Sequence, residues 1–224
     1  MQIEPIAYIE TDFKEKFGIP RQSLRVESLG RIVFYPKYRD REALRGIEAF
    51  SHLWLLFDFS LAHREGFSPT VRPPRLGGNT RVGVFASRSP YRPNSIGLSS
   101  VKFVRVDKNE QDGDYIVVKG ADLLDGTPIY DIKPYIPHSD CHPDAVGSYA
   151  DVHRHHALSV NYPPALLSRL PEDKREVAIA CLAEDPRPSY QNDPDRIYRM
   201  RFSDFEIVFR VENAELTVTD TYPV

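Results

Sequence analysis

The sequence predicts a mainly β fold, a barrel or sandwich over the first two-thirds of the chain, followed by a small α+β appendage. Seven short segments rich in Ile, Val, Phe and Tyr lie before residue 136 and are bounded by Gly, Pro, Asp and Asn. Only one clear helix is expected among them, which argues against alternating βαβ units. After residue 162 the pattern changes to short helices followed by a hairpin.

The first two-thirds contain the expected strands in close succession. The seven strands are expected at 3–11, 31–36, 52–60, 80–87, 98–107, 114–124 and 127–135. The one helix is expected at 40–52, with Asp40 as its N-cap and with Leu44 and Ile47 on one apolar face. Gly46 weakens this helix modestly.

The C-terminal third has a different organisation. Residues 163–185 predict two short helices interrupted at Pro171, and residues 196–222 predict a half-buried strand, a turn at 212–214 and a second strand. The stretch before them is polar and His-rich without a sustained period. We therefore expect domains at 1–140 and 163–224, joined by a linker at 141–162.

Composition is that of an ordinary globular protein, with 224 residues, 41% hydrophobic and 27% charged. The longest apolar run, 53–59, contains Asp58 and is too short to span a bilayer. The N-terminus lacks a basic region followed by an apolar stretch, so no secretory signal is expected. Nothing in the setting of Cys141 or Cys181 demands a disulfide. These features predict a cytoplasmic protein with no membrane partner.

The net charge of −3 hides an asymmetry. Residues 1–105 carry 17 Lys and Arg against 10 Asp and Glu, whereas residues 106–224 carry 12 against 22. Residues 64–92 contain six arginines, no lysine and one acid. A solvated face is the simplest interpretation. Arginine is, however, also the residue whose planar guanidinium group binds phosphate or carboxylate through two hydrogen bonds. An anionic ligand, small or polymeric, is therefore a second interpretation.

One stretch in this arginine-rich region, SRSPYRPNSIG at 87–97, is suited to hold a ligand. Pro90 and Pro93 fix the backbone and reduce the entropy lost when neighbouring side chains bind. Arg88 and Arg92 are then held at a defined separation between two expected strands. The alternative is a tight connector whose arginines pair with nearby acids.

Acidic residues gather in ADLLDGTPIYDIKPY at 121–135. Asp122 or Asp125 could accept hydrogen bonds from ribose hydroxyls or an amino group, or face a cation, while Asp125 also suits a simple turn. Lys133 and Tyr135 add a positive charge and an aromatic face. DPRPSY at 185–190 again sets an arginine between prolines, next to a tyrosine, which would suit a nucleotide or a plain connector.

Several familiar signatures are missing. No G-x-G-x-x-G follows a strand and no phosphate-binding P-loop occurs, which argues against a Rossmann cofactor domain or a P-loop fold. His138, Cys141 and His142 form a loose cluster without the paired spacing of a zinc site. We expect a solvated loop there and no metal, with a metal-dependent hydrolase or nuclease as a rival interpretation.

Long motifs in this chain resemble the TrmO family over nearly its whole length. They are GIPRQ (18–22), RGIEAFSHLWLLFDF (45–59), RPPRLGGNTRVGVFASRSPYRPNSIGLS (72–99), GADLLDGTPIYDIKPYIP (120–137) and EDPRPSY (184–190). The resemblance implies a single-sheeted β-barrel with a small C-terminal domain, in a homodimer. It also implies transfer of a methyl group from S-adenosylmethionine to N6 of the threonylcarbamoyl-modified adenosine next to the tRNA anticodon.

The resemblance also suggests which residues bind the cofactor. The expected positions are Arg88 and Leu98, Asp122, Leu123, Leu124 and Asp125, together with Gln22, Ser23, Leu61 and Ala62.

Catalysis and tRNA binding are assigned from chemistry. The N6 nitrogen is a poor nucleophile, so a base such as Asp131 or Tyr130 would help to remove its proton. The expected tRNA contacts are Arg72, Arg75, Arg81, Arg92, Arg187 and Tyr190. The remaining alternative is a non-catalytic RNA-binding barrel, which would not bind S-adenosylmethionine.

Overall fold

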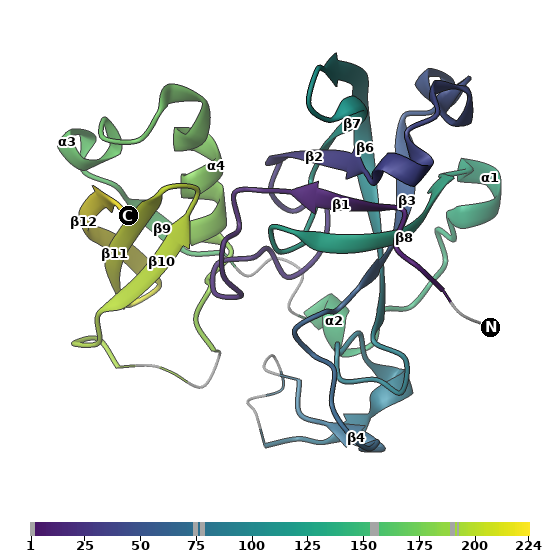
Figure 1. Ribbon diagram of the computed structural model, residues 1–224. Helices are drawn as coiled ribbons and strands as arrows, with labels where there is room; N and C mark the ends of the chain where they lie inside the picture. The colour runs from purple at the N-terminus through teal and green to yellow at the C-terminus, as the bar shows by residue number, and fades with distance from the viewer. Residues whose placement is uncertain (1–2, 74–75, 77–78, 153–156, 189–190, 192) are drawn as a thin grey trace.

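The computed structural model describes residues 3–73, 76, 79–152, 157–188, 191 and 193–224. Figure 1 shows two bodies side by side, a β-barrel built from the first part of the chain and a smaller sheet with helices built from the last part. The mainly β class predicted from the sequence is confirmed.

Six strands close the barrel in the order β1-β2-β7-β6-β3-β8, with β8 pairing back to β1. All of these neighbours are antiparallel. The strands are β1 (Ala7–Glu10), β2 (Leu29–Phe34), β3 (His52–Asp58), β6 (Ile96–Asn109), β7 (Gly113–Lys119) and β8 (Thr127–Pro134).

Alternating side chains fill the barrel interior. On β3, Leu53, Leu55 and Phe57 are buried while the residues between them face outward. They pack with side chains from the other strands, including Ile9 and Ile116. Each such burial stabilises the fold by about 1.5–3 kcal/mol. The period of two in the sequence therefore decides which residues are available on the barrel's outer wall.

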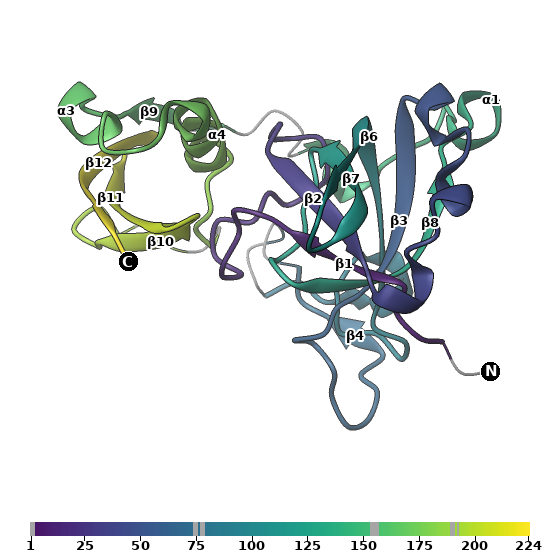
Figure 2. The same cartoon turned by 45° about the horizontal axis from the view of Figure 1, so that its top comes forward.

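The strand expected at 80–87 is wrong. Only β5 (Val82–Gly83) is extended, pairing with β4 (Thr70–Val71), and the chain then turns through the 3₁₀ helix η5 (Val84–Ala86). The turn breaks the alternation, burying Val84 and leaving Phe85 74% exposed. The described residues between 64 and 92 form a lobe beside the barrel, seen around β4 in Figure 2.

The helix expected at 40–52 is also wrong, since this segment forms two 3₁₀ turns, η2 (Arg41–Leu44) and η3 (Ile47–Ala49). Gly46 adopts a left-handed φ of 87° between them, which a continuous helix cannot accommodate. The predicted cap is confirmed, because Asp40 accepts a hydrogen bond from the Glu42 amide. Another short 3₁₀ turn, η1 (Pro36–Tyr38), precedes η2.

The C-terminal body is a four-stranded sheet in the order β10-β11-β12-β9, covered by helices. Its elements are β9 (Ser159–Asn161), α3 (Pro164–Leu167), α4 (Glu172–Ala183), β10 (Tyr198–Phe202), β11 (Phe205–Glu212) and β12 (Glu215–Pro223). The two helices and the hairpin of β11 and β12 are as predicted, with Asn213 and Ala214 at φ of 47° and 64° in the turn, whereas the separate strand β10 was not predicted. Positive φ at both positions matches the twist of paired strands.

The segment after β1 belongs structurally to both bodies. Phe13 and Val26 are buried in the C-terminal cluster, and Phe13 forms a β-bridge with Phe202. Lys174 of α4 also forms an ion pair with the largely buried Asp12 at 2.7 Å. The division at 1–140 and 163–224 stays a prediction, although part of its expected linker forms β9, which pairs in parallel with β12.

Two one-turn helices, α1 (Pro137–Asp140) and α2 (Tyr149–Val152), follow β8 in the chain. Within the described part of the chain, no helix is long and apolar enough to cross a membrane.

Candidate functional site

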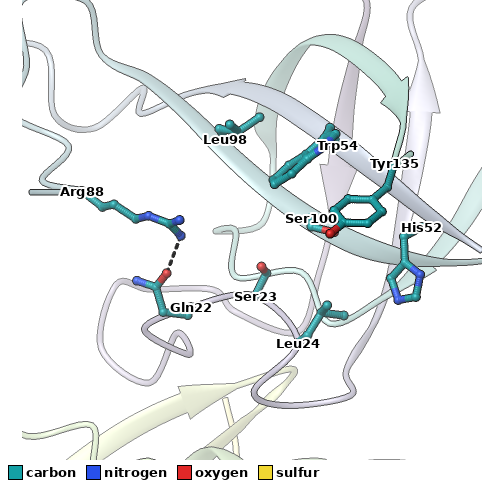
Figure 3. A pocket seen from close by; sticks show the side chains of 9 residues that line it. All are labelled: Gln22, Ser23, Leu24, His52, Trp54, Arg88, Leu98, Ser100 and Tyr135. Carbon is teal, nitrogen blue, oxygen red and sulfur yellow. Dashed lines mark hydrogen bonds between the residues drawn. The ribbon is translucent and has the colours of Figure 1, made fainter. Parts of the chain in front are cut away.

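A pocket of about 460 Å³ opens on the outer wall of the barrel. His52 and Trp54 of β3 and Leu98 and Ser100 of β6 form one side, because inward residues alternate with them on both strands. Its size falls within the range of small-molecule sites. Figure 3 shows these side chains facing the segment at residues 22–24.

The opposite wall comes from two loops. Gln22, Ser23 and Leu24 belong to the segment shared by the two bodies, and Arg88 comes from the lobe. Arg88 donates from Nη1 to Gln22 Oε1 at 2.6 Å, the contact dashed in Figure 3. The two loops therefore meet over the strands and bring one positive charge to the pocket.

An aromatic corner closes one end of the pocket. The rings of Trp54 and Tyr135 lie 5.5 Å apart at 41°. Trp54 donates from Nε1 to Asp140 of α1 at 2.8 Å, which holds the indole in place. The amide of Ile136 and then this indole lower the pKa of Asp140, so the carboxylate that fixes the indole stays charged. Flat apolar faces beside a cation suit a ligand with both a nucleobase and an anionic group.

Asp122 lies close to Ser23 and Arg88 of the loop wall and to Ser99 of β6. Its Oδ1 is buried without a hydrogen-bond partner among the described residues. Burial raises the pKa of Asp122, while the Ser99 hydroxyl and the charge of Arg88 partly offset the shift. A buried acceptor without a donor is costly, and a ligand that supplies the donor would remove the cost.

We expect Asp122→Asn to stabilise the ligand-free protein at neutral pH. Because the folded state raises the pKa of Asp122, the wild type loses stability as pH rises through that pKa, whereas the amide does not ionise. Thermal unfolding should show the gain at neutral pH and its disappearance as pH falls toward about 3.9. A gain that persists unchanged at acid pH would contradict this account.

Gly120 shapes the loop wall from behind. Its φ of 79° is left-handed, its carbonyl accepts from the Leu24 amide at 2.8 Å, and an added Cβ would lie 3.0 Å from Leu24 Cα. We expect Gly120→Ala to cost more than the 1–2 kcal/mol typical of a left-handed alanine, and to weaken ligand binding by displacing Leu24.

Gly46→Ala is the matched control for this prediction. Gly46 has a φ of 87° and open space around the position of an added Cβ. Denaturant unfolding should show the strain alone for Gly46→Ala and a larger loss for Gly120→Ala. Equal losses in the two variants would show that the Leu24 contact contributes nothing.

The structure brings together only part of the expected cofactor set. Gln22, Ser23, Arg88 and Leu98 line the pocket, with Asp122 behind it. The other expected positions are placed elsewhere and do not line the pocket: Leu61, Ala62, Leu123, Leu124 and Asp125.

These remaining positions have local partners. Leu123 is buried in the barrel core, and the Leu124 carbonyl accepts from Thr127. Asp125 accepts from the Thr11 amide at 2.8 Å and forms an ion pair with Lys14, so its side chain contacts the segment after β1. Ala62 is buried and Leu61 is 61% exposed.

The two expected bases lie on the same outer wall as the pocket. Leu56 is opposite Leu98 on one side and Asp131 on the other, so Asp131 lies about 10 Å, two strand spacings, from Leu98. Asp131 forms an ion pair with Lys133 at 2.8 Å and is 45% exposed.

Tyr130 is the extra residue of a β-bulge opposite Leu56 and Phe57. Burial and the hydrogen-bonded carboxylate of Asp58 raise the pKa of Tyr130. A raised pKa keeps the phenol protonated and disfavours Tyr130 as a base.

The expected tRNA-binding residues lie in different environments, and only some of them are free to contact tRNA. Arg72 and Arg81 are exposed on the lobe. Arg92 donates to the carbonyls of Val84 and Ser87, so part of its guanidinium holds the lobe together. Arg75 and Tyr190 lie outside the described residues.

Arg187 has a structural role in place of the predicted phosphate contact. It is 8% exposed and pairs with Asp185 through two hydrogen bonds of 2.8 and 3.0 Å. The guanidinium is buried inside the protein and cannot reach a phosphate on the surface.

Of the described residues that line the pocket, the sequence analysis did not identify Leu24, His52, Trp54 and Ser100. The alternation of HLWLLFD contained a usable signal, because burying Leu53 and Leu55 must turn His52 and Trp54 outward. A tryptophan turned outward gives the barrel wall a flat aromatic face on which a ligand can stack.

Among the residues that the structure describes, no three His, Cys, Asp or Glu side chains are arranged to hold a metal ion. Both cysteines are free thiols, Cys141 exposed and Cys181 buried.

The fold and pocket define a class, a closed β-barrel with a pocket on its outer wall and a C-terminal α+β body. Family models for the tRNA-methyltransferase O N-terminal domain and the TrmO C-terminal domain match residues 8–141 and 155–224. The chain belongs to the TrmO family.

Named relatives and solved structures resemble the whole chain. The tRNA (adenine(37)-N6)-methyltransferase of Escherichia coli is 41% identical, over 97% of this chain and 96% of the relative. A Pseudomonas aeruginosa protein named putative S-adenosylmethionine-dependent methyltransferase RcsF is 39% identical over 96% and 94%. The crystal structure of TrmO from Pseudomonas aeruginosa superposes with a TM-score of 0.78 at 33% identity, covering 99% of this chain and 98% of that one.

Proposed function

We propose that this protein transfers a methyl group from S-adenosylmethionine to N6 of adenine 37 in tRNA, the activity named for its Escherichia coli relative. The observation that carries the proposal is the pocket in which Gln22, Ser23, Arg88 and Leu98 meet. Membership of the TrmO family and the conformity of both bodies to the family's domains support it.

The residues present fit S-adenosylmethionine. The unpartnered Oδ1 of Asp122 suits a hydroxyl or ammonium donor, Arg88 suits a carboxylate, and the Trp54 and Tyr135 faces suit the adenine. When bound, this cofactor supplies an electrophilic methyl group on its sulfonium. The chain's own task is to orient both reactants and to exclude water.

We further propose that the substrate adenosine already carries the threonylcarbamoyl group on N6 and that Asp131 takes the N6 proton. The amide-like lone pair of that nitrogen is delocalised, so a base is needed when it attacks the methyl group. Asp131 is on the same outer wall as the pocket and its side chain is 45% exposed, whereas the raised pKa of Tyr130 disfavours that phenol as a base.

The lobe is the proposed tRNA contact. Arg72 and Arg81 present exposed guanidinium groups for phosphates. Phe67 and Phe85 are exposed and stack at 6.3 Å with rings 26° apart, and the Arg92 guanidinium lies 5.9 Å above the Phe85 ring. Exposed aromatic faces among arginines suit the unstacked bases of an anticodon loop.

A homodimer is the proposed assembly. Leu24, Ile96 and Leu98 expose apolar surface at or next to the pocket, and a second copy would cover it. Light scattering of the purified protein should then give twice the mass of 25.7 kDa, and a monomer mass would contradict it.

Methyl transfer from labelled cofactor to tRNA tests the activity. We expect label on adenine 37 of tRNA that carries the threonylcarbamoyl group, and none on tRNA lacking it. Equal label on both would reject the requirement for the prior modification, and no label on either would reject the activity.

Cofactor binding can be tested separately from transfer. Trp54 is the only tryptophan of the chain and lines the pocket. Adding S-adenosylmethionine should therefore change its fluorescence with a saturating dependence. A protein that binds tRNA but shows no such change and no heat of cofactor binding would be the non-catalytic RNA-binding barrel.

A further inference from the structure

Three pocket residues, Gln22, Ser23 and Leu24, lie between two arginines that reach the other body of the protein. Arg21 donates from Nη2 to the carbonyls of Asp185 at 2.9 Å and Arg187 at 2.7 Å. Arg25 binds Glu184 through Nε and Nη2, with contacts of 3.1 and 2.7 Å. The loop wall of the pocket is therefore held at both ends by residues that directly follow α4.

The turn that accepts these arginines is itself fixed. Asp185 adopts a left-handed φ of 52°, and its carboxylate accepts from both the backbone and the guanidinium of Arg187. Asp185 and Arg187 are both more than nine-tenths buried. A rigid, buried ion pair thus shapes the backbone whose carbonyls face Arg21.

The segment between the arginines needs such support. Leu24 has a φ of 61°, which residues other than glycine adopt at a cost and keep only when neighbours enforce it. On the barrel side the Leu24 amide donates to Gly120, and Gln22 accepts from Arg88. The side facing the C-terminal body is secured by Arg21 and Arg25.

We propose that Arg21, Arg25, Glu184 and the carbonyls of residues 185 and 187 form a clamp that positions the cofactor wall. The proposal rests on the proposed function, because the ligand affected is S-adenosylmethionine. None of the described residues that line the pocket comes from the C-terminal body. Cofactor affinity nevertheless depends on that body, and Arg25 and Glu184 are positioning residues that act through Gln22–Leu24.

The coupling is reciprocal. If the clamp raises affinity for the cofactor, the bound cofactor must stabilise the clamp by the same free energy. Cofactor binding should therefore protect the turn after α4, which lies outside the pocket, from hydrogen exchange. This links the methyl donor site to the attachment of the C-terminal body.

Calorimetry with S-adenosylmethionine on the full chain tests the clamp. We expect Arg25→Ala and Glu184→Ala each to weaken binding about tenfold, and the charge-exchanged double variant Arg25→Glu with Glu184→Arg to recover most of it. Arg169→Ala is the matched control, since Arg169 forms an ion pair with Asp220 at 2.8 Å in the C-terminal body and is expected to bind as the wild type does. Wild-type affinity in both folded single variants would overturn the proposal.

A second readout does not depend on the cofactor. The Leu24 amide should exchange its hydrogen faster in Arg25→Ala, because the segment it anchors is released. If that variant does not fold, Arg25→Lys keeps the charge but loses the two-point contact, and an unchanged Leu24 exchange rate in it overturns the clamp. Failure of the wild type to bind the cofactor would instead reject the proposed function, and the exchange measurement would still decide the clamp.

Discussion

Asp131→Asn should lower the rate of methyl transfer by roughly 10²–10⁴-fold, the usual contribution of a general base. The amide keeps the size of the side chain and its acceptor oxygen for the Ile132 amide, so the strand is not disturbed. It loses the ability to accept a proton. Single-turnover methylation of threonylcarbamoylated tRNA under saturating cofactor measures this step.

Two control measurements show whether a lower rate comes from loss of the base. Cofactor affinity should stay at the wild-type value, because Asp131 is outside the pocket. Lys133→Ala removes the ion-pair partner of Asp131 and is expected to change the rate far less. An unchanged single-turnover rate in Asp131→Asn would remove this residue from the role.

Asp185→Asn should destabilise the protein by about 3–5 kcal/mol, the cost of leaving one charge of a buried pair without its partner. Arg187 is 8% exposed and cannot regain water without opening the turn. Asparagine tolerates the left-handed backbone as aspartate does, so the loss reports the missing charge and not strain. Denaturant unfolding measures the change.

The control for this variant is an exposed ion pair. Glu42 and Arg45 are 66% and 77% exposed, and Glu42→Ala should cost no more than about 1 kcal/mol. If Asp185→Asn lowered the free energy of unfolding by as little as Glu42→Ala, the buried ion pair would not stabilise the fold. Because the same turn faces Arg21, this variant should also weaken cofactor binding.

Local patterns predicted the regular elements well. Alternation in β3 and in the C-terminal hairpin reflects one buried face, which leaves a period of two in the chain itself. The helix expected at 40–52 failed because Gly46 was treated as a small penalty, whereas its left-handed φ ends the helix. The strand expected at 80–87 failed because its apolar residues do not share one face.

The site was predicted in part, and the missing part has a physical reason. Family motifs identified Arg88, Leu98, Gln22 and Ser23, which are far apart in sequence and converge on one pocket. Trp54 was not assigned to the site, although only alternate residues of its strand can face inward and Trp54 must therefore face outward. The attachment of Arg21 and Arg25 to residues 184–187 spans about 160 positions, and no periodic pattern encodes contacts at that distance.

The bridge between Phe13 and Phe202 has a consequence for synthesis on the ribosome. The barrel strands are complete once residue 134 has emerged, but Phe13 and Val26 must wait for the strands after residue 197 before their side chains are covered. Contacts of such long sequence separation form late, and exposed apolar side chains invite aggregation in the meantime. The segment around Phe13 and Val26 is therefore made early and keeps apolar side chains exposed until the C-terminal strands are made.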